Sequence, residues 1–219
     1  MEKEDKKRIT AIFGEMNLAM DLHNKGWLVY RSYIDEYIDF IIARYYCKKC
    51  KEFTSLEKRT REGTSKSGSA TFPTNLCDTC QTDSIKIITR FLQVKTAEGV
   101  EPRIKKYKNL QCKDFSFHAK LRSNVDDRAF YAWIALMPMA NNNEKLMPYY
   151  YIFNHTEINK FDDINIPSYQ KTDNQQTHLY INPEIVVKNE GKKYNFDCFN
   201  KDFFNNFAKL EEIKNSDGI

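Results

Sequence analysis

Apolar residues near the start of the chain recur three or four positions apart, which is the spacing of one face of an α-helix. The pattern extends from Glu4 to Asn24, and Gly26 follows where a helix would end. We therefore expect a helix here, with apolar positions at Ile9, Ile12, Phe13, Met16, Ala19 and Met20. Glu15 lies on the same helix among small and apolar neighbours, and the alternative to a functional role is a helix-edge glutamate that reaches water.

Runs rich in β-branched and aromatic residues predict most of the other elements as strands. The expected strands are Trp27 to Arg31, Tyr37 to Tyr46, Ile85 to Thr96, Phe130 to Met137, Tyr149 to Phe153, Leu179 to Ile181 and Ile185 to Val187. The remaining expectations are a polar loop from Asn141 to Lys145, a short helix from Thr156 to Phe161, an irregular stretch from Pro167 to Gln176 and a closing helix near Lys201 to Lys214. Together these elements predict an α/β fold.

Three polar residues interrupt the predicted strands. Asp39 lies in the middle of an apolar run, where an ionisable group needs a partner or a metal. Gln93 and Lys95 alternate with Leu92 and Val94. Because side chains alternate across a strand, the carboxamide and the ammonium group project from one face while the apolar pair enters the opposite packing layer. A solvated strand edge is the alternative interpretation for these polar residues.

Four of the six cysteines form two Cys-x-x-Cys pairs between the second and third predicted strands. They are Cys47, Cys50, Cys77 and Cys80. Four thiolates would complete the tetrahedral shell of one zinc ion and leave no position for a reactive water, so we expect a structural zinc. Residues 47–84 then form an insertion. The other two cysteines, Cys112 and Cys198, are expected to be inert thiols.

Composition and charge narrow the function classes without selecting one. The chain has 219 residues, of which 41% are hydrophobic, and this suits one folded domain with an elaboration. The net charge of +4 permits an anionic partner but does not demand one. No window holds the ~18 apolar residues of a membrane span and no secretion signal is evident, so we expect a cytoplasmic protein without a membrane partner. Neither a glycine-rich phosphate loop nor a Gly-x-Ser-x-Gly nucleophile motif occurs.

Basic residues gather in three stretches that would suit a phosphate backbone. They are Lys48 and Lys49 within the first cysteine pair, Lys58, Arg59, Arg61 and Lys66 between the pairs, and Arg103, Lys105, Lys106 and Lys108 further along the chain. Solvated charged loops are the alternative. If these residues do contact nucleic acid, they would supply salt-dependent affinity rather than sequence recognition.

The helix, the two strands and their polar residues occur in an order that resembles the PD-(D/E)XK nuclease superfamily. The likeness is to the branch that contains archaeal Holliday-junction resolvases and restriction-like endonucleases. The matching residues are Gly14-Glu15, Gly26-Trp27, Asp35-x-x-Ile38-Asp39 and Gln93-Val94-Lys95-Thr96. The resemblance covers about residues 10–46 and 85–153. It implies a restriction-endonuclease-like mixed β-sheet flanked by helices, with a core of residues 1–46 and 85–219 and an inserted zinc-ribbon arm at 47–84.

The resemblance also implies a role for each site residue. Asp39 would be the main ligand of Mg²⁺ or Mn²⁺, and the Gln93 side chain and the Val94 carbonyl would add hard oxygen ligands. Lys95 would orient or deprotonate the attacking water, and Glu15 would bind the water shell of the metal or a second ion. The family pattern usually has Asp or Glu where this chain has Gln93, so the expected metal affinity is weaker.

The expected function is a Mg²⁺-dependent endonuclease that hydrolyses phosphodiester bonds in DNA and serves restriction, mobile elements or antiphage defence. RNA as a substrate and a homodimeric state stay open. One alternative is a non-catalytic, zinc-ribbon nucleic-acid-binding module on a degenerate nuclease fold. Another is a Holliday-junction resolvase that acts as a dimer.

Overall fold

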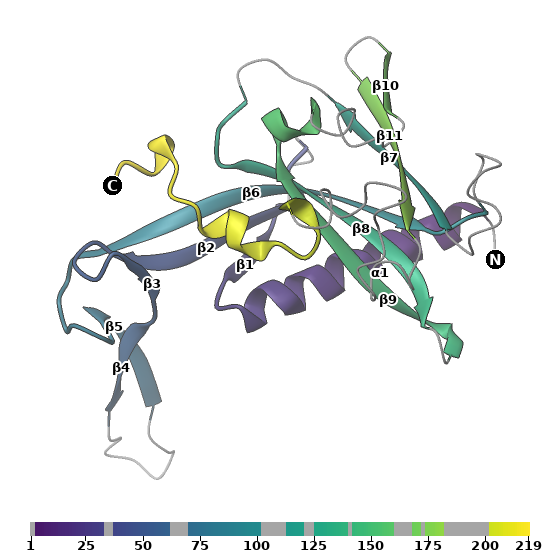
Figure 1. Ribbon diagram of the computed structural model, residues 1–219. Helices are drawn as coiled ribbons and strands as arrows, with labels where there is room; N and C mark the ends of the chain where they lie inside the picture. Colours follow the sequence, from purple (N-terminus) through teal and green to yellow (C-terminus); the bar gives the residue numbers. More distant parts are fainter. Residues whose placement is uncertain are drawn as a thin grey trace.

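The computed structural model describes residues 3–32, 37–61, 70–101, 113–120, 125–139, 142–159, 168–171, 174–181 and 202–219. One long helix, α1 (Lys3–Asn24), lies along a mixed sheet whose strand order is β1-β2-β6-β8-β9 (Figure 1). The strands are β1 (Leu28–Arg31), β2 (Phe40–Cys47), β6 (Ile85–Glu98), β8 (Ala129–Met139) and β9 (Asn142–Asn154). The predicted α/β class with a mixed sheet is confirmed.

One pair of neighbours in this sheet is parallel. β6 and β8 run side by side from Phe91 opposite Ala129 to Glu98 opposite Leu136, whereas the other neighbours are antiparallel. Parallel strands need a long crossover connection. Part of that connection is β7 (Lys113–Lys120), a strand that the sequence did not predict.

The two faces of the central sheet are covered differently. On one face, Leu18 and Leu22 of α1 pack against Leu92 and Val94 of β6 in a core that also contains Trp27. The opposite face is covered by a second sheet of order β10-β11-β7, with β10 at Ser168–Lys171 and β11 at Asn174–Ile181. Among the described residues, α1 is the one long helix that flanks the sheet, and the rest of the predicted restriction-endonuclease-like arrangement stays a prediction.

Aromatic residues fill the space between the two sheets. Phe117 of β7 stacks on Trp133 of β8, with the ring centroids 4.8 Å apart, and Phe153 of β9 meets the same indole edge-on at 4.7 Å. All three side chains are buried. A layer of this kind needs β-strand residues that present large rings on one face, and β7 supplies them with Phe115 and Phe117, while Ala119 is buried in the same cluster.

The described part of the C-terminal segment, residues 202–219, does not form the long helix predicted near Lys201 to Lys214. After a helical pair at Asp202 and Phe203 it has two short 3₁₀ turns, η3 (Phe207–Glu211) and η4 (Asn215–Asp217). The buried guanidinium of Arg90 donates hydrogen bonds to the carbonyl oxygens of Leu210 (3.0 Å) and Glu212 (2.6 Å). These carbonyls therefore bond to a distant side chain rather than to N–H groups of a helix. Asn205, with φ 50°, also breaks helical geometry just before η3.

Other boundaries differ from the prediction by a few residues. β2 begins at Phe40 rather than at Tyr37, which has a φ of 68°. β9 begins at Asn142, within the predicted loop, and β10 and β11 occupy much of the stretch predicted as irregular. The short helix near Thr156 is the 3₁₀ turn η1 (His155–Asn159). The predicted strand at Ile185 to Val187 lies outside the described residues.

An arm projects from the end of the β2–β6 ladder (Figure 1). The last pair of that ladder is Cys47 opposite Ile85, and the intervening chain forms β3 (Glu52–Thr54), β4 (Leu56–Arg61) and β5 (Ala70–Cys77). β4 and β5 pair only with each other, while β3 pairs with β2. No helix in the described parts of the chain is long and apolar enough to cross a membrane.

Candidate active site and metal centre

Asp39 lies where the β2–β6 ladder ends. Its N–H donates to the Leu92 carbonyl at 2.9 Å, and its carboxylate oxygen Oδ2 accepts a hydrogen bond from the Val94 N–H at 2.6 Å. The ladder itself stops one residue further along β2, at Phe40 opposite Leu92. Beyond this point the side chain of Asp39 takes the place of a backbone partner for β6. The carboxylate is thereby held against the strand that carries Gln93 and Lys95.

The two polar residues of β6 lie on the face predicted from strand alternation. Leu92 and Val94 are 1% and 6% exposed in the core beneath α1. Gln93 is half-buried and Lys95 is exposed. From Gln93 to Glu98, β6 has β8 as its only ladder partner among the described strands. On the other side of this segment, the Val94 N–H bonds to the Asp39 side chain rather than to a described strand.

A close contact between α1 and β6 brings Glu15 to the same place. Gly14 packs directly on Thr96, and a Cβ atom at Gly14 would lie 2.1 Å from Thr96 Oγ1 and 2.6 Å from Cγ2. Only glycine permits this approach, because any larger residue would overlap the threonine. Glu15 follows immediately and is therefore carried next to the end of β1, where it forms an ion pair with Arg31 at 3.1 Å.

We expect Gly14→Ala to destabilise the fold although alanine is the better helix former. Alanine should gain ~1 kcal/mol in helix propensity. Overpacking a tight contact typically costs ~1–3 kcal/mol, and the separation of only 2.1 Å from the Thr96 side chain places this case at ~2–3 kcal/mol. Urea unfolding should therefore show a net loss of about 1–2 kcal/mol.

Thr96→Ala is the compensating change, because it removes both of the closest atoms and Thr96 Oγ1 has no hydrogen-bond partner in the described part of the chain. Gly14→Ala/Thr96→Ala should recover part of the loss. Asn17→Ala on the same helix is the matched control. Equal stability of Gly14→Ala and the wild type would contradict the tight contact.

The pKa of the Glu15 carboxyl depends on its burial and on the charges of Arg31, Asp39 and Lys95. Burial raises its pKa most, the Arg31 guanidinium lowers it, the negative charge of Asp39 raises it, and the Lys95 ammonium lowers it. The net result is a pKa above the ordinary value of glutamate. Asp39 and Lys95 therefore both act electrostatically on Glu15, while the catalytic roles expected for the three residues stay predictions. Such a shift, with named charged neighbours, is common at functional sites.

Three details of this site were not evident in the sequence. Val94 contacts Asp39 through its N–H, while the predicted use of its carbonyl as a metal ligand stays a prediction. Arg31 was not predicted as a partner of Glu15, because an exposed arginine at a strand end gives no local signal of which distant acid it meets. The neighbour of Gln93 across the β6–β8 pair, the buried Tyr131, was also not predicted.

The four cysteines of the arm converge on one point. Their sulfur atoms all lie within 4.8 Å of one another, with Cys47 Sγ and Cys80 Sγ 3.6 Å apart and Cys50 Sγ and Cys77 Sγ 4.0 Å apart. Four sulfurs around a tetrahedral zinc at ~2.3 Å would be about 3.8 Å from each other. The prediction that these cysteines form one metal-binding cluster is confirmed in its geometry, and the cluster could hold a metal ion such as zinc.

Two similar turns build the cluster. In each, the residue after the second cysteine has a left-handed backbone, with φ 59° at Lys51 and φ 57° at Gln81. The N–H of each donates back to the first cysteine carbonyl, Lys51 to Cys47 at 2.8 Å and Gln81 to Cys77 at 3.0 Å. Each turn directs its two thiols toward the same point, as a shared metal ion requires.

Hydroxyl groups next to the cluster favour thiolates. The hydrogen bond with Thr54 lowers the pKa of Cys77 to about 6, and the hydrogen bond with Thr82 lowers the pKa of Cys80. The hydrogen bond between Cys50 and Cys80 raises the pKa of Cys50 to about 12, because the Cys50 proton serves that bond when no metal is bound. A zinc ion would replace these shared protons and bind all four sulfurs as thiolates.

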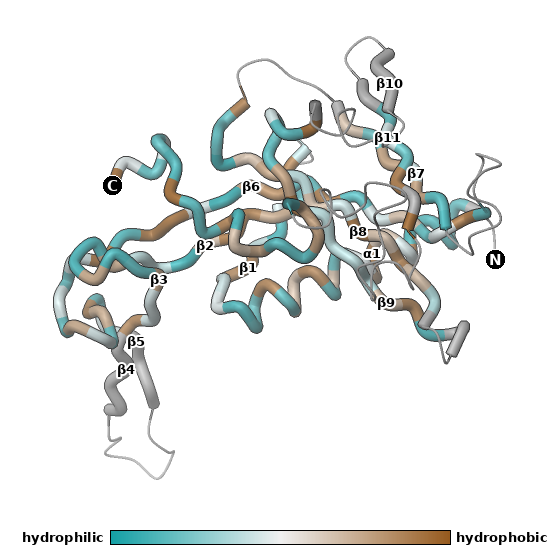
Figure 2. The backbone as a smooth tube through the Cα atoms, viewed as in Figure 1, coloured by the Kyte–Doolittle hydropathy of each residue, from teal (hydrophilic) through white to brown (hydrophobic). Residues whose placement is uncertain are grey.

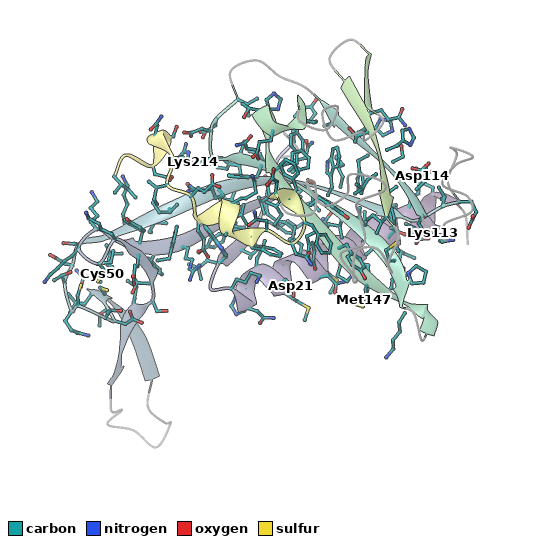
Figure 3. All side chains as sticks on the ribbon, in the orientation of Figure 1. Asp21, Cys50, Lys113, Asp114, Met147 and Lys214 are labelled. Atoms are coloured by element: carbon teal, nitrogen blue, oxygen red, sulfur yellow. The ribbon has the colours of Figure 1, made fainter. Side chains whose placement is uncertain are left out.

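The cysteine cluster and the acidic site are separate. Asp39 precedes β2 and Cys47 ends it, so the two sites lie roughly 25 Å apart at ~3.3 Å per residue. Cys50, labelled in Figure 3, marks the cluster in the arm, well away from the body of α1. A metal in the arm therefore cannot take part in chemistry at Asp39. Within the described residues, the cysteines are the only group of three or more His, Cys, Asp or Glu placed to share a metal ion.

Of the residues predicted to contact nucleic acid, only two have described side chains. Lys48 and Lys49 are exposed in the first cysteine turn. Lys58, Arg59 and Arg61 lie on β4, but their side chains are outside the described set. Lys66, Arg103, Lys105, Lys106 and Lys108 lie outside the described residues altogether. These contacts stay predictions.

No protein-family model matches the chain, and no curated protein or solved structure gives a significant match.

Proposed function

We propose that the protein is a divalent-cation-dependent endonuclease that hydrolyses phosphodiester bonds in DNA. The observation that carries the proposal is the hydrogen bond from the Val94 N–H to Asp39 Oδ2, because it holds a carboxylate at the start of the Gln93-Val94-Lys95 segment. A carboxylate has about four lone-pair positions. The bond to Val94 therefore orients Asp39 and leaves capacity to bind Mg²⁺ or Mn²⁺, with the Gln93 amide oxygen as a further hard ligand.

The other two residues have roles that suit a hydrolytic reaction. Lys95 is exposed and follows Val94 directly, so its ammonium group can orient the attacking water and stabilise the charge that develops on phosphate. Glu15 lies in the field of both Asp39 and Lys95, and its carboxyl group can hydrogen-bond to the water shell of the cation. Basic residues of the arm, which we propose is a zinc ribbon, would bind the DNA backbone.

Plasmid cleavage in Mg²⁺, Mn²⁺ or EDTA tests the proposal. Asp39→Asn keeps the size of the side chain and the acceptor for Val94 but removes the negative charge, so we expect the cleavage rate to fall at least ~100-fold. Lys95→Ala should have an effect of similar size. Asp83→Asn and Lys7→Ala, at exposed positions away from the site, are the matched controls. Gln93→Glu should lower the Mg²⁺ concentration required, because it adds a negative ligand.

A second candidate function is nucleic-acid binding without cleavage, and the neutral side chain of Gln93 supports it. With Glu15 and Asp39 as the carboxylates of this site, a cation would be bound more weakly than by three acids. A protein that binds nucleic acid without cutting it would show salt-dependent DNA binding in EDTA and Mg²⁺ alike. Metal-independent binding with no cleavage of DNA or RNA, or full activity of Asp39→Asn and Lys95→Ala, would reject the nuclease proposal.

A further inference from the structure

The apolar stripe that predicts α1 points away from the sheet. The buried residues of the helix are Gly14, Leu18 and Leu22, on the opposite side. The outward stripe has side chains that are 40–64% exposed, namely Ile9, Ile12, Phe13, Met16 and Met20. Brown segments recur along α1 in Figure 2. Single exposed apolar residues are ordinary, but five in helical spacing along one helix form a continuous patch.

A cavity adjoins the N-terminal half of this stripe. It has a volume of about 500 Å³ and is lined by Ile9, Thr10 and Phe13 of α1 and by Glu98, Leu136, Lys145 and Leu146 of the sheet. Its lining is therefore mainly apolar, with polar groups from Thr10, Glu98 and Lys145. The stripe and the cavity together offer a ridge and a hollow on one face, which are the two parts that an interdigitating helix contact needs.

We propose that α1 forms the interface of a symmetric homodimer, in which the helices of two copies pack antiparallel along the outward stripe. A two-fold axis between Phe13 and Met16 maps the stripe onto itself. Phe13 then lies opposite the partner's Met16, and Ile9 lies opposite the partner's Met20. Met20 is the most exposed member of the stripe, at 64%, and its flexible thioether enters the partner's cavity beside Ile9. An isologous contact of this kind closes after two subunits.

The charges of α1 favour the antiparallel arrangement. The first six residues, Lys3 to Arg8, comprise four basic and two acidic side chains and so carry a net +2. Residues 15–24 contain two acids, of which Glu15 is paired with Arg31, so Asp21 is the acidic group left at this end. Antiparallel packing keeps the two basic ends apart and sets each beside Asp21 of the partner helix. Parallel packing would place the two basic ends together and would also align the helix dipoles.

The area is in the range of a modest but specific dimer. Five large side chains, each with about half of its surface exposed, form a patch on the order of the ~300–600 Å² that marks interaction sites on monomers. A standard interface buries ~800 Å² on each partner, so the stripe corresponds to the smaller, transient class of interfaces. We therefore expect a dimer with a dissociation constant near micromolar rather than a permanent one.

Sedimentation equilibrium of the full-length protein, loaded with zinc, tests the interface. The wild type should be a dimer, while Met20→Lys and Ile9→Glu should each raise the dissociation constant at least ~100-fold, since the two-fold axis repeats each change. Ile87→Glu is the control, because Ile87 is 56% exposed on β6, away from the stripe. It should stay dimeric. Zinc content and circular dichroism show that every variant is folded.

Mixing the two variants distinguishes the proposed register from general stickiness. In an equimolar mixture, Glu at position 9 of one copy faces Lys at position 20 of the other, and the second pair is the native Ile9 and Met20. The mixture should therefore form a heterodimer. A monomeric wild type at ~100 μM, a monomeric mixture, or dissociation by Ile87→Glu would each overturn the proposal. Because the readout is molecular mass, the result is independent of whether the protein cleaves DNA.

Discussion

Cys77→Ser is expected to abolish tight binding of one zinc ion by the arm. Structural zinc sites contribute about 10–16 kcal/mol of binding free energy in small domains. β4 and β5 pair only with each other, and β3 has only a short ladder with β2, so little else holds the arm together. Loss of one thiolate should raise the zinc dissociation constant at least ~1,000-fold, measured by competition with a chromogenic chelator.

Substitutions near the cluster should weaken zinc affinity less than the loss of a cysteine does. Thr54→Ala removes a hydroxyl 3.4 Å from Cys77 Sγ, and such changes around a metal site typically weaken affinity ~10–100-fold. Cys198→Ser is the matched control and should keep one zinc per chain. Limited proteolysis of Cys77→Ser should cut first between residues 48 and 84 while the central sheet persists. An unchanged zinc affinity of Cys77→Ser would contradict the four-sulfur site.

Arg90→Met is expected to cost about 3–5 kcal/mol of folding free energy, the usual effect of removing one partner from a buried ion pair. The Arg90 side chain is 0% exposed and donates to both carboxylate oxygens of Asp217, at 2.7 and 2.9 Å. Its other donors reach the carbonyls of Thr89, Leu210 and Glu212. With the guanidinium removed, a buried carboxylate and carbonyls of the C-terminal segment lose their partners.

A double-mutant cycle in urea isolates the pair itself. Arg90→Met/Asp217→Asn should be more stable than the sum of the single losses predicts, because the second change removes the uncompensated charge. Glu212→Gln is the control, since the Glu212–Lys214 pair involves a carboxylate that is 54% exposed and should contribute less than ~1 kcal/mol. Additive losses in the cycle would show that Arg90 acts through packing rather than through Asp217.

The same pair makes stability depend on pH in the acid range. Burial raises the pKa of Asp217. Hydrogen bonds from Arg90 and from the Lys214 N–H lower the pKa by more than burial raises it, so the net pKa is below the ordinary value. A depressed folded-state pKa stabilises the protein above the unfolded value of ~3.9, and this contribution is lost as the pH falls through the folded pKa. Asp217→Asn should therefore flatten the fall in stability below about pH 4.

The strand alternation of β6 and the cysteine spacing were determined by the sequence alone. Both depend on local geometry, since a period of two assigns Leu92 and Val94 to one face and Gln93 and Lys95 to the other. The turn within a Cys-x-x-Cys pair likewise needs only its own residues, and two such turns offer four sulfurs. These predictions are confirmed by the burial along β6 and by the convergence of the thiols.

Tertiary contacts decided the features that depend on distant partners. The periodicity of α1 predicts a helix but not which stripe faces the sheet, and the Gly14–Thr96 contact turns the larger apolar stripe outward. The C-terminal stripe has helical spacing, yet its carbonyls bond to Arg90, 120 or more residues earlier in the chain. The sequence indicates that Asp39 needs a partner, but only the folded chain, in which the ladder ends beside it, identifies that partner as the Val94 N–H. Local patterns report which backbone conformations a segment favours, whereas the partners of buried polar groups are known only after the chain has folded.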